Sequence, residues 1–98
     1  MEIYRETLGS TLCLTLSGRL DTSTAPQLET EIRNSIEGIT KLELNFAEVD
    51  YVSSAGLRVL LAAQKTMQKQ GELILKNVPE AVMEVLEITG FVDILTII

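Results

Sequence analysis

Residues 41–46 read KLELNF, a stretch in which polar and apolar side chains alternate strictly. A period of two places Leu42, Leu44 and Phe46 on one face of a β-strand and the polar side chains on the other face. A parallel strand that is covered by helices on both sides would be apolar on both faces. Residues 11–17 alternate in the same manner. We therefore predict a sheet with helices packed on one face and a more polar second face.

Three stretches between the expected strands show the periodicity of amphipathic helices. The first begins at Thr24, whose hydroxyl we expect to form a capping box with the side chain of Gln27. The second covers residues 53–70, and the third opens at Pro79, a residue that a first helical turn tolerates. Basic side chains recur at helical spacing on one side of the second helix: Arg58, Lys65 and Lys69. Glycines are expected to end the three helices: Gly38, Gly71 and Gly90.

The remaining strands complete the order β-β-α-β-α-β-α-β. Residues 2–7 alternate weakly and are predicted to form an edge strand, which a turn at residues 8–10 joins to the strand at residues 11–17. Residues 47–51 are predicted to form a loop, and residues 92–97 the last strand. A hairpin followed by strand–helix units predicts an α/β fold with a mixed, mostly parallel sheet and right-handed crossovers.

The length and composition of the chain restrict the possible functions. Its 98 residues predict a single domain over residues 1–98. A formal net charge of −6 argues against nucleic acid and anionic membranes as partners. Because histidine is absent and cysteine occurs once, Cys/His zinc sites and internal disulfides are excluded. We find no signal peptide and no apolar run long enough to span a membrane, and therefore expect a cytoplasmic location.

Residues 50–57, with the sequence DYVSSAGL, hold the chemically most informative side chains. Two hydroxyls precede a glycine at a predicted helix start, where unpaired backbone amides carry partial positive charge and tolerate a phosphate. From local physics alone, either Ser53 or Ser54 is an ordinary N-cap residue. Gly56 lowers helix propensity by about 1 kcal/mol relative to alanine. It therefore indicates either tight packing or the close approach of another group to the backbone.

Three segments carry a family resemblance: residues 18–25 (GRLDTSTA), residues 49–61 (VDYVSSAGLRVLL) and residues 85–91 (VLEITGF). The central segment looks like the signature of STAS domains, especially those of bacterial anti-sigma factor antagonists. The other two are similar to the family's first loop and to its C-terminal helix. Taken together, the segments resemble this family over nearly the whole chain, and the family's fold has the element order that the periodicity predicts.

The resemblance implies that Ser54, two residues before Gly56, is the phosphorylation site. Where the family often has Asp before the acceptor and a second Ser after it, this chain has Ser53 and Ala55, so Ser53 remains the alternative acceptor. Asp21 falls at the acidic position of the first loop, which lies near the acceptor in the family. The implied partner-binding surface comprises nine residues: Asp21, Thr22, Ser23, Ser53, Ser54, Ala55, Gly56, Leu57 and Arg58.

Two of these residues also have purely structural interpretations. The side chain of Asp21 can form a turn by accepting hydrogen bonds from its own backbone. Arg58 can be a solvated side chain on the exposed side of a helix. Both interpretations stay open beside a direct contact with a partner.

By the same resemblance, the chain is a partner-switching regulator and not an enzyme. Its unphosphorylated form is implied to bind an anti-sigma factor that is also a serine kinase, and thereby to release a sigma factor. The kinase brings the ATP and phosphorylates Ser54, and a phosphatase of the PP2C class resets the switch. No cofactor or metal is implied for this chain itself. We expect a monomer or a weak dimer, with the polar sheet face or the N-terminal edge strand as possible contacts.

Two alternatives belong to other functional classes. The first is a constitutive STAS subunit of a transporter complex, of the lipid-trafficking ABC type, which needs no phosphorylation. The second is an enzyme in which Asp21 and Asp50 form an acid/base pair. Such a pair requires a pocket that separates the pKa values of the two carboxyl groups, and a chain of this size offers no evident one.

Overall fold

A computed structural model describes the whole chain, residues 1–98. The predicted element order is confirmed, with one short 3-10 helix (η1) added near the C-terminus. The elements are β1 (Glu2–Leu8), β2 (Thr11–Leu20), α1 (Ala25–Ser35), β3 (Lys41–Val52), α2 (Ser54–Gln68), β4 (Glu72–Lys76), α3 (Glu80–Ile88), η1 (Phe91–Asp93) and β5 (Thr96–Ile97).

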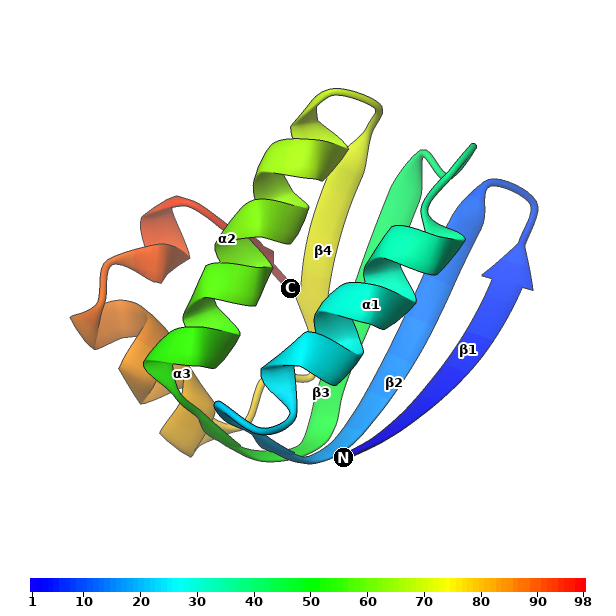
Figure 1. Ribbon diagram of the computed structural model, residues 1–98. Coiled ribbons are helices and arrows are strands. Elements are labelled where there is room, and N and C mark those ends of the chain that lie inside the picture. The colour runs from blue at the N-terminus through cyan, green and yellow to red at the C-terminus, as the bar shows by residue number, and fades with distance from the viewer.

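The five strands form one sheet in the order β1-β2-β3-β4-β5 (Figure 1). The hairpin strands β1 and β2 are antiparallel, and all later neighbours are parallel. The mixed, mostly parallel sheet is therefore as predicted. Since the strands β2, β3 and β4 run in one direction, their carboxyl ends and the loops that follow them meet at the same edge of the sheet.

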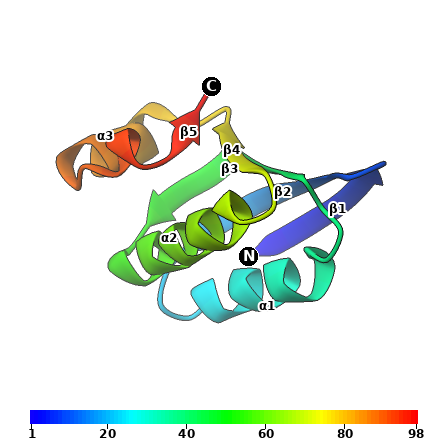
Figure 2. The ribbon, with the colours of Figure 1, turned by 90° about the horizontal axis from the view of Figure 1, so that it is seen from above.

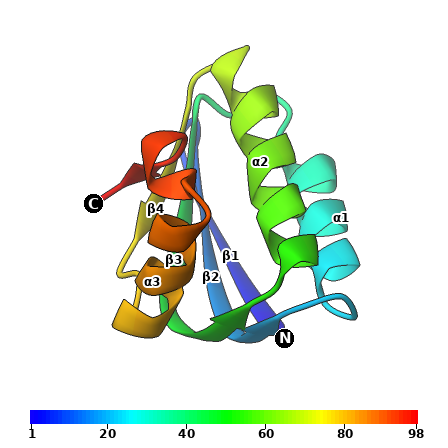
Figure 3. The ribbon, with the colours of Figure 1, turned by 90° about the vertical axis from the view of Figure 1, so that its left-hand side faces the viewer.

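Helices α1 and α2 lie side by side against one face of the sheet (Figure 2). The side chains predicted for this face, among them Leu14, Leu44 and Phe46, are completely buried. The buried residues Leu28 and Leu60 join the same core cluster from the two helices. Helix α3 packs against β3 at the end of the molecule away from α1 (Figure 3), and its buried residues Val82 and Leu86 belong to the same core cluster.

The second face of the sheet is more polar and carries ion pairs across the strands. Lys41 Nζ lies 4.0 Å from a Glu43 oxygen and 3.9 Å from a Glu72 oxygen, and Lys76 Nζ lies 3.3 Å from Glu43. Cys13 pairs in register with Glu43 on this face and is half-buried. The free thiol of Cys13 therefore lies on the more polar side of its strand.

Two predicted boundaries are wrong. Residues 47–51 are not a loop, because β3 continues through them to Val52 and stays paired with β2. Irregularities in the β2–β3 register absorb the break in alternation that follows Phe46. The last strand does not cover residues 92–97. The 3-10 turn of η1 occupies its first residues, and only Thr96–Ile97 pair with β4.

The predicted capping box of α1 is also wrong. Thr24 occupies the N-cap position but makes no side-chain cap hydrogen bond. Its hydroxyl donates instead to the Arg19 carbonyl oxygen at 2.6 Å and accepts from the Asp21 amide at 2.9 Å. Gln27 does not reach back to the N-cap, since its side-chain amide donates to the Met1 carbonyl oxygen. The hydroxyl is thus used to shape the preceding loop.

The one-sided core predicts different costs for two leucine truncations. Leu44→Ala removes a fully buried side chain and should lower the free energy of unfolding by about 2–5 kcal/mol. Leu8→Ala truncates a side chain that is 71% exposed and should change the free energy of unfolding by no more than about 0.5 kcal/mol. Urea unfolding followed by circular dichroism measures both values. Equal losses in the two variants would contradict the assignment of the core to the helix-covered face.

Candidate functional site

The two serines at the start of α2 have different roles. Ser53 is the N-cap residue, with φ −95° and ψ 176°, and its hydroxyl oxygen accepts from the Gly56 amide at 3.4 Å. Ser54 is the first residue of the helix and is exposed. Its hydroxyl has no hydrogen-bond partner within the chain. The first turn of α2 therefore presents one serine bound to the backbone and one free serine.

The start of α2 is tied to the end of β2 by two contacts with Leu20. The Ser53 amide donates to the Leu20 carbonyl oxygen at 2.9 Å. A Cβ atom on Gly56 would lie 2.7 Å from Leu20 Cγ and 3.0 Å from the Leu20 carbonyl oxygen. Glycine is thus required because α2 and β2 approach each other closely here. Of the two interpretations of Gly56 from the sequence, the tight packing is what the structure shows.

Asp21 organises the loop that follows β2. Its Oδ1 accepts from the Ser23 amide at 3.0 Å, the Ser23 hydroxyl at 2.8 Å and the Thr24 amide at 3.2 Å. Its Oδ2 lies 3.5 Å from Arg19 Nε. These hydrogen bonds lower the pKa of Asp21 to about 2. The bond from the Ser23 hydroxyl is the main cause, and the bonds from the two backbone amides add to it. The turn-forming role of Asp21 is therefore present.

The contact between Arg19 and Tyr51, at the same edge of the sheet, does not follow from the sequence pattern. The guanidinium of Arg19 stacks on the ring of Tyr51, 4.1 Å from its centroid. Arg19 and Tyr51 are partners in the β2–β3 register, so they project from the same face. The loss of alternation over residues 47–51 predicts a loop, so the sequence pattern does not place Arg19 and Tyr51 on neighbouring strands. With β3 extended through this segment, the two side chains become cross-strand neighbours.

The nine predicted site residues gather at the edge formed by the β2 and β3 carboxyl ends, but they differ in exposure. Four of them are exposed to solvent: Thr22, Ser23, Ser54 and Arg58. Three are half-buried: Asp21, Ser53 and Ala55. Gly56 and Leu57 are buried, so their contribution is to place the helix start and not to offer side chains at the surface.

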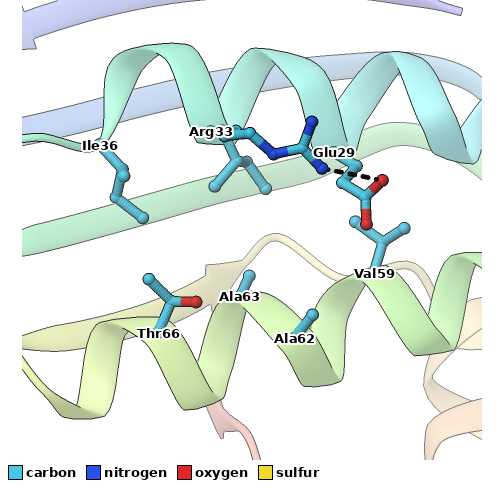
Figure 4. A pocket seen from close by; sticks show the side chains of 8 residues that line it. Glu29, Arg33, Ile36, Val59, Ala62, Ala63 and Thr66 are labelled. Atoms are coloured by element: carbon cyan, nitrogen blue, oxygen red, sulfur yellow. Dashed lines mark ion pairs between the residues drawn. The ribbon is translucent and has the colours of Figure 1, made fainter.

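A shallow groove of about 180 Å³ lies between α1 and α2 (Figure 4). Its walls are mostly apolar, and an ion pair between Arg33 and Glu29, 3.3 Å apart, lies at its rim. Neither Asp21 nor Asp50 lines it, so the two carboxylates of the enzyme alternative do not share this cavity. In addition, no helix of the structure combines the length and apolar character that crossing a bilayer requires.

Comparison with known proteins agrees with the resemblance seen in the sequence. A family model described as the STAS domain matches residues 2–98. BtrV of Bordetella bronchiseptica, named as a candidate anti-sigma factor antagonist, is 38% identical over 96 residues, or 96% of this chain and 83% of BtrV. The anti-sigma-B factor antagonist of Listeria monocytogenes is 36% identical over 85 residues, or 84% of this chain and 74% of that protein.

Solved structures share the fold at lower identity. The anti-sigma factor antagonist SpoIIAA in its unphosphorylated form has a TM-score of 0.85 and 22% identity, over 99% of this chain and 88% of SpoIIAA. The Bacillus cell fate determinant SpoIIAA in the phosphorylated form has a TM-score of 0.77 and 21% identity, over 99% and 91% of the two chains. At these identities the likeness establishes the fold.

The contact between Gly56 and Leu20 predicts a coupled pair of substitutions. Gly56→Ala should lower the free energy of unfolding by about 1–3 kcal/mol, because its methyl group overlaps a fully buried side chain. In a Leu20→Ala background the same change should cost less, since the overlap with Leu20 Cγ is removed and only the contact with the Leu20 carbonyl oxygen, at 3.0 Å, is left. A double-mutant cycle of urea unfolding measures this coupling. Additive losses would show that the side chain of Leu20 does not constrain Gly56.

The lowered pKa of Asp21 predicts a pH-dependent contribution to stability. Since the folded-state pKa lies below the ordinary value of 3.8, the contribution is present above pH 3.8 and is lost as the pH falls towards 2. Carboxyl chemical shifts recorded by NMR against pH give the pKa directly. Ser23→Ala removes the hydroxyl donor and should raise the pKa of Asp21. An unchanged pKa in that variant would rule out Ser23 as the main cause.

Proposed function

The chain belongs to the STAS domain family, and we propose that it acts as an anti-sigma factor antagonist that is switched by phosphorylation of Ser54. The observation that carries this proposal is the free, exposed hydroxyl of Ser54 at the first turn of α2, beside the loop of Asp21. It occurs in a chain whose relatives include anti-sigma-B factor antagonists at 36% identity. The partner is an anti-sigma factor, and its release from the sigma factor permits transcription.

The structure favours Ser54 over Ser53 as the modified residue. The Ser53 hydroxyl caps α2 through the Gly56 amide and is only half exposed, so modification there would remove the cap. Ser54 has no such bond, and a phosphate on it would lie at the positive end of the helix dipole. The fold therefore tolerates a phosphate on Ser54 at no cost in hydrogen bonds within the chain.

The switch consists of one phosphoryl transfer. The anti-sigma factor, acting as a serine kinase, transfers the γ-phosphoryl group of ATP to Ser54 Oγ, so that an ester bond forms, ADP leaves and the hydroxyl proton is released. The phosphate brings about −1.5 to −2 charges into the contact surface. Burying that charge against the partner is unfavourable, so the complex dissociates. A PP2C-type phosphatase hydrolyses the ester and restores binding. That SpoIIAA was solved in both forms supports this cycle.

In this scheme the chain supplies a surface and an acceptor hydroxyl, and the kinase supplies the nucleotide. The chain itself is proposed not to be an enzyme, to need no cofactor and to act in the cytoplasm, where its partners reside. The constitutive transporter subunit differs from this proposal in one respect that is open to experiment, because it does not require a phosphate on Ser54.

Incubation with ATP and the anti-sigma factor kinase of the same genome tests the switch. We expect one phosphate on Ser54 by peptide mass spectrometry, none in Ser54→Ala, and one in Ser53→Ala, which loses about 0.5–2 kcal/mol of stability with the cap. In calorimetry, Ser54→Ala should bind the kinase like the wild type. Ser54→Asp should bind at least about tenfold more weakly, which corresponds to about 1.4 kcal/mol.

Two outcomes would change the interpretation. A phosphate on Ser53 would keep the switch but move its site. If the kinase is active on another substrate and leaves this chain unmodified, the phosphorylation switch is refuted and the constitutive STAS subunit takes its place.

A further inference from the structure

The basic side chains that lack an ion-pair partner are all on one helix. The chain has eight Lys and Arg residues. Five of them lie within 4.0 Å of a carboxylate: Arg5, Arg19, Arg33, Lys41 and Lys76. The other three belong to α2 and its C-cap: Arg58, Lys65 and Lys69. All three are exposed to solvent.

These three cations form one stripe along the helix. At about 100° per residue, the spacings of seven and four place Arg58, Lys65 and Lys69 within about 40° of one another. Ser54 lies four residues before Arg58, on the same face. No acidic residue occurs from Ser54 to Lys69. We call these three cations the α2 basic stripe; it begins at the Ser54 end of the helix and follows its exposed side.

The stripe stands out against the charge of the molecule. The chain carries 14 acidic residues and a formal net charge of −6, yet none of these carboxylates pairs with the stripe. Lys65 and Lys69, at the C-terminal end of α2, are favoured by the helix dipole. Arg58 lies in the second turn, where the dipole does not favour a cation. Local stability therefore accounts for the two lysines but not for Arg58.

We propose that the α2 basic stripe is a docking surface for an acidic face of the anti-sigma factor, an inference that rests on the function proposed above. Complementary charge on two protein surfaces speeds their encounter and fixes their register. Continuity with Ser54 places the stripe at the same contact surface as the switch. Three cations on a chain of net charge −6 suit a protein partner with clustered carboxylates better than a nucleic acid or a lipid surface.

The stripe also explains how one phosphate can have a large effect. A phosphate on Ser54 adds about −1.5 to −2 charges next to a surface of +3, so that only about +1 to +1.5 remains. Arg58, one turn away, is placed to pair with the phosphate and is thereby withdrawn from the partner. Phosphorylation thus weakens the attraction along the whole helix, beyond the local cost of burying the phosphate.

Two variants with the same change in net charge separate the stripe from the rest of the surface. The stripe variant is Arg58→Gln, Lys65→Gln and Lys69→Gln, and glutamine preserves helix propensity. The control variant is Arg5→Gln, Lys41→Gln and Lys76→Gln, three cations outside α2. Thermal melts establish that both are folded. In stopped-flow binding to the anti-sigma factor at low salt, the stripe variant should associate at least about tenfold more slowly, with a weaker salt dependence. The control should associate like the wild type.

The outcomes distinguish the two proposals. If the wild type binds and the stripe variant matches the control, the stripe proposal is overturned and the antagonist function stands. If the wild type does not bind the anti-sigma factor, the antagonist function fails.

A second measurement, NMR titration with a ten-residue polyglutamate peptide at low salt, then tests the stripe by itself. Amide shifts confined to residues 54–69 support it, and shifts elsewhere or none overturn it. Stripe-dependent binding to duplex DNA or phosphatidylserine vesicles instead would overturn the assignment to a protein partner.

Discussion

The end of β2 and the start of α2 meet at Leu20. Its carbonyl oxygen accepts from the Ser53 amide, and its buried side chain lies where Gly56 has no Cβ atom. This contact fixes the direction in which α2 leaves the sheet and brings the loop of Asp21 beside the free hydroxyl of Ser54. The core side chains then bury the inner face of α2 against the sheet. A side chain at position 56 would push the helix away and separate its first turn from the loop of Asp21.

Charge is arranged on this scaffold in two different ways. On the polar sheet face, Lys41, Glu43, Glu72 and Lys76 neutralise one another across β3 and β4, and solvent-accessible ion pairs of this kind contribute little to stability. On α2 the cations are left without partners. Unpaired charge is available for long-range attraction, whereas a paired network largely cancels its own field. A single phosphate at one end of the unpaired set would therefore have a large relative effect, as the proposed switch at Ser54 requires.

The prediction from sequence failed where one residue had two possible partners. The spacing of Thr24 and Gln27 fits a capping box, but the Thr24 hydroxyl bonds to the backbone of Arg19 and Asp21 instead. A local sequence pattern does not show which of these competing hydrogen bonds forms. Residues 47–51 break the alternation of β3, a pattern that predicts a loop, although an irregular register lets the strand continue. That error concealed the stacking of Arg19 on Tyr51, which depends on register and not on proximity in the chain.

The sequence by itself determined the fold class, the polar and apolar faces of the sheet, the start of α2 at the two serines and the helical spacing of the three cations. Each of these depends on periodicity or on a local motif, and both are contained in residues that are close together in the sequence. Only the tertiary structure decided which serine is free, why Gly56 is a glycine and which cations lack an ion-pair partner. The glycine and the ion pairs between strands depend on contacts between segments far apart in the chain, such as Leu20 with Gly56. The free serine depends on which of two adjacent hydroxyls meets the Gly56 amide once the helix start is in place, a choice that the sequence pattern leaves open.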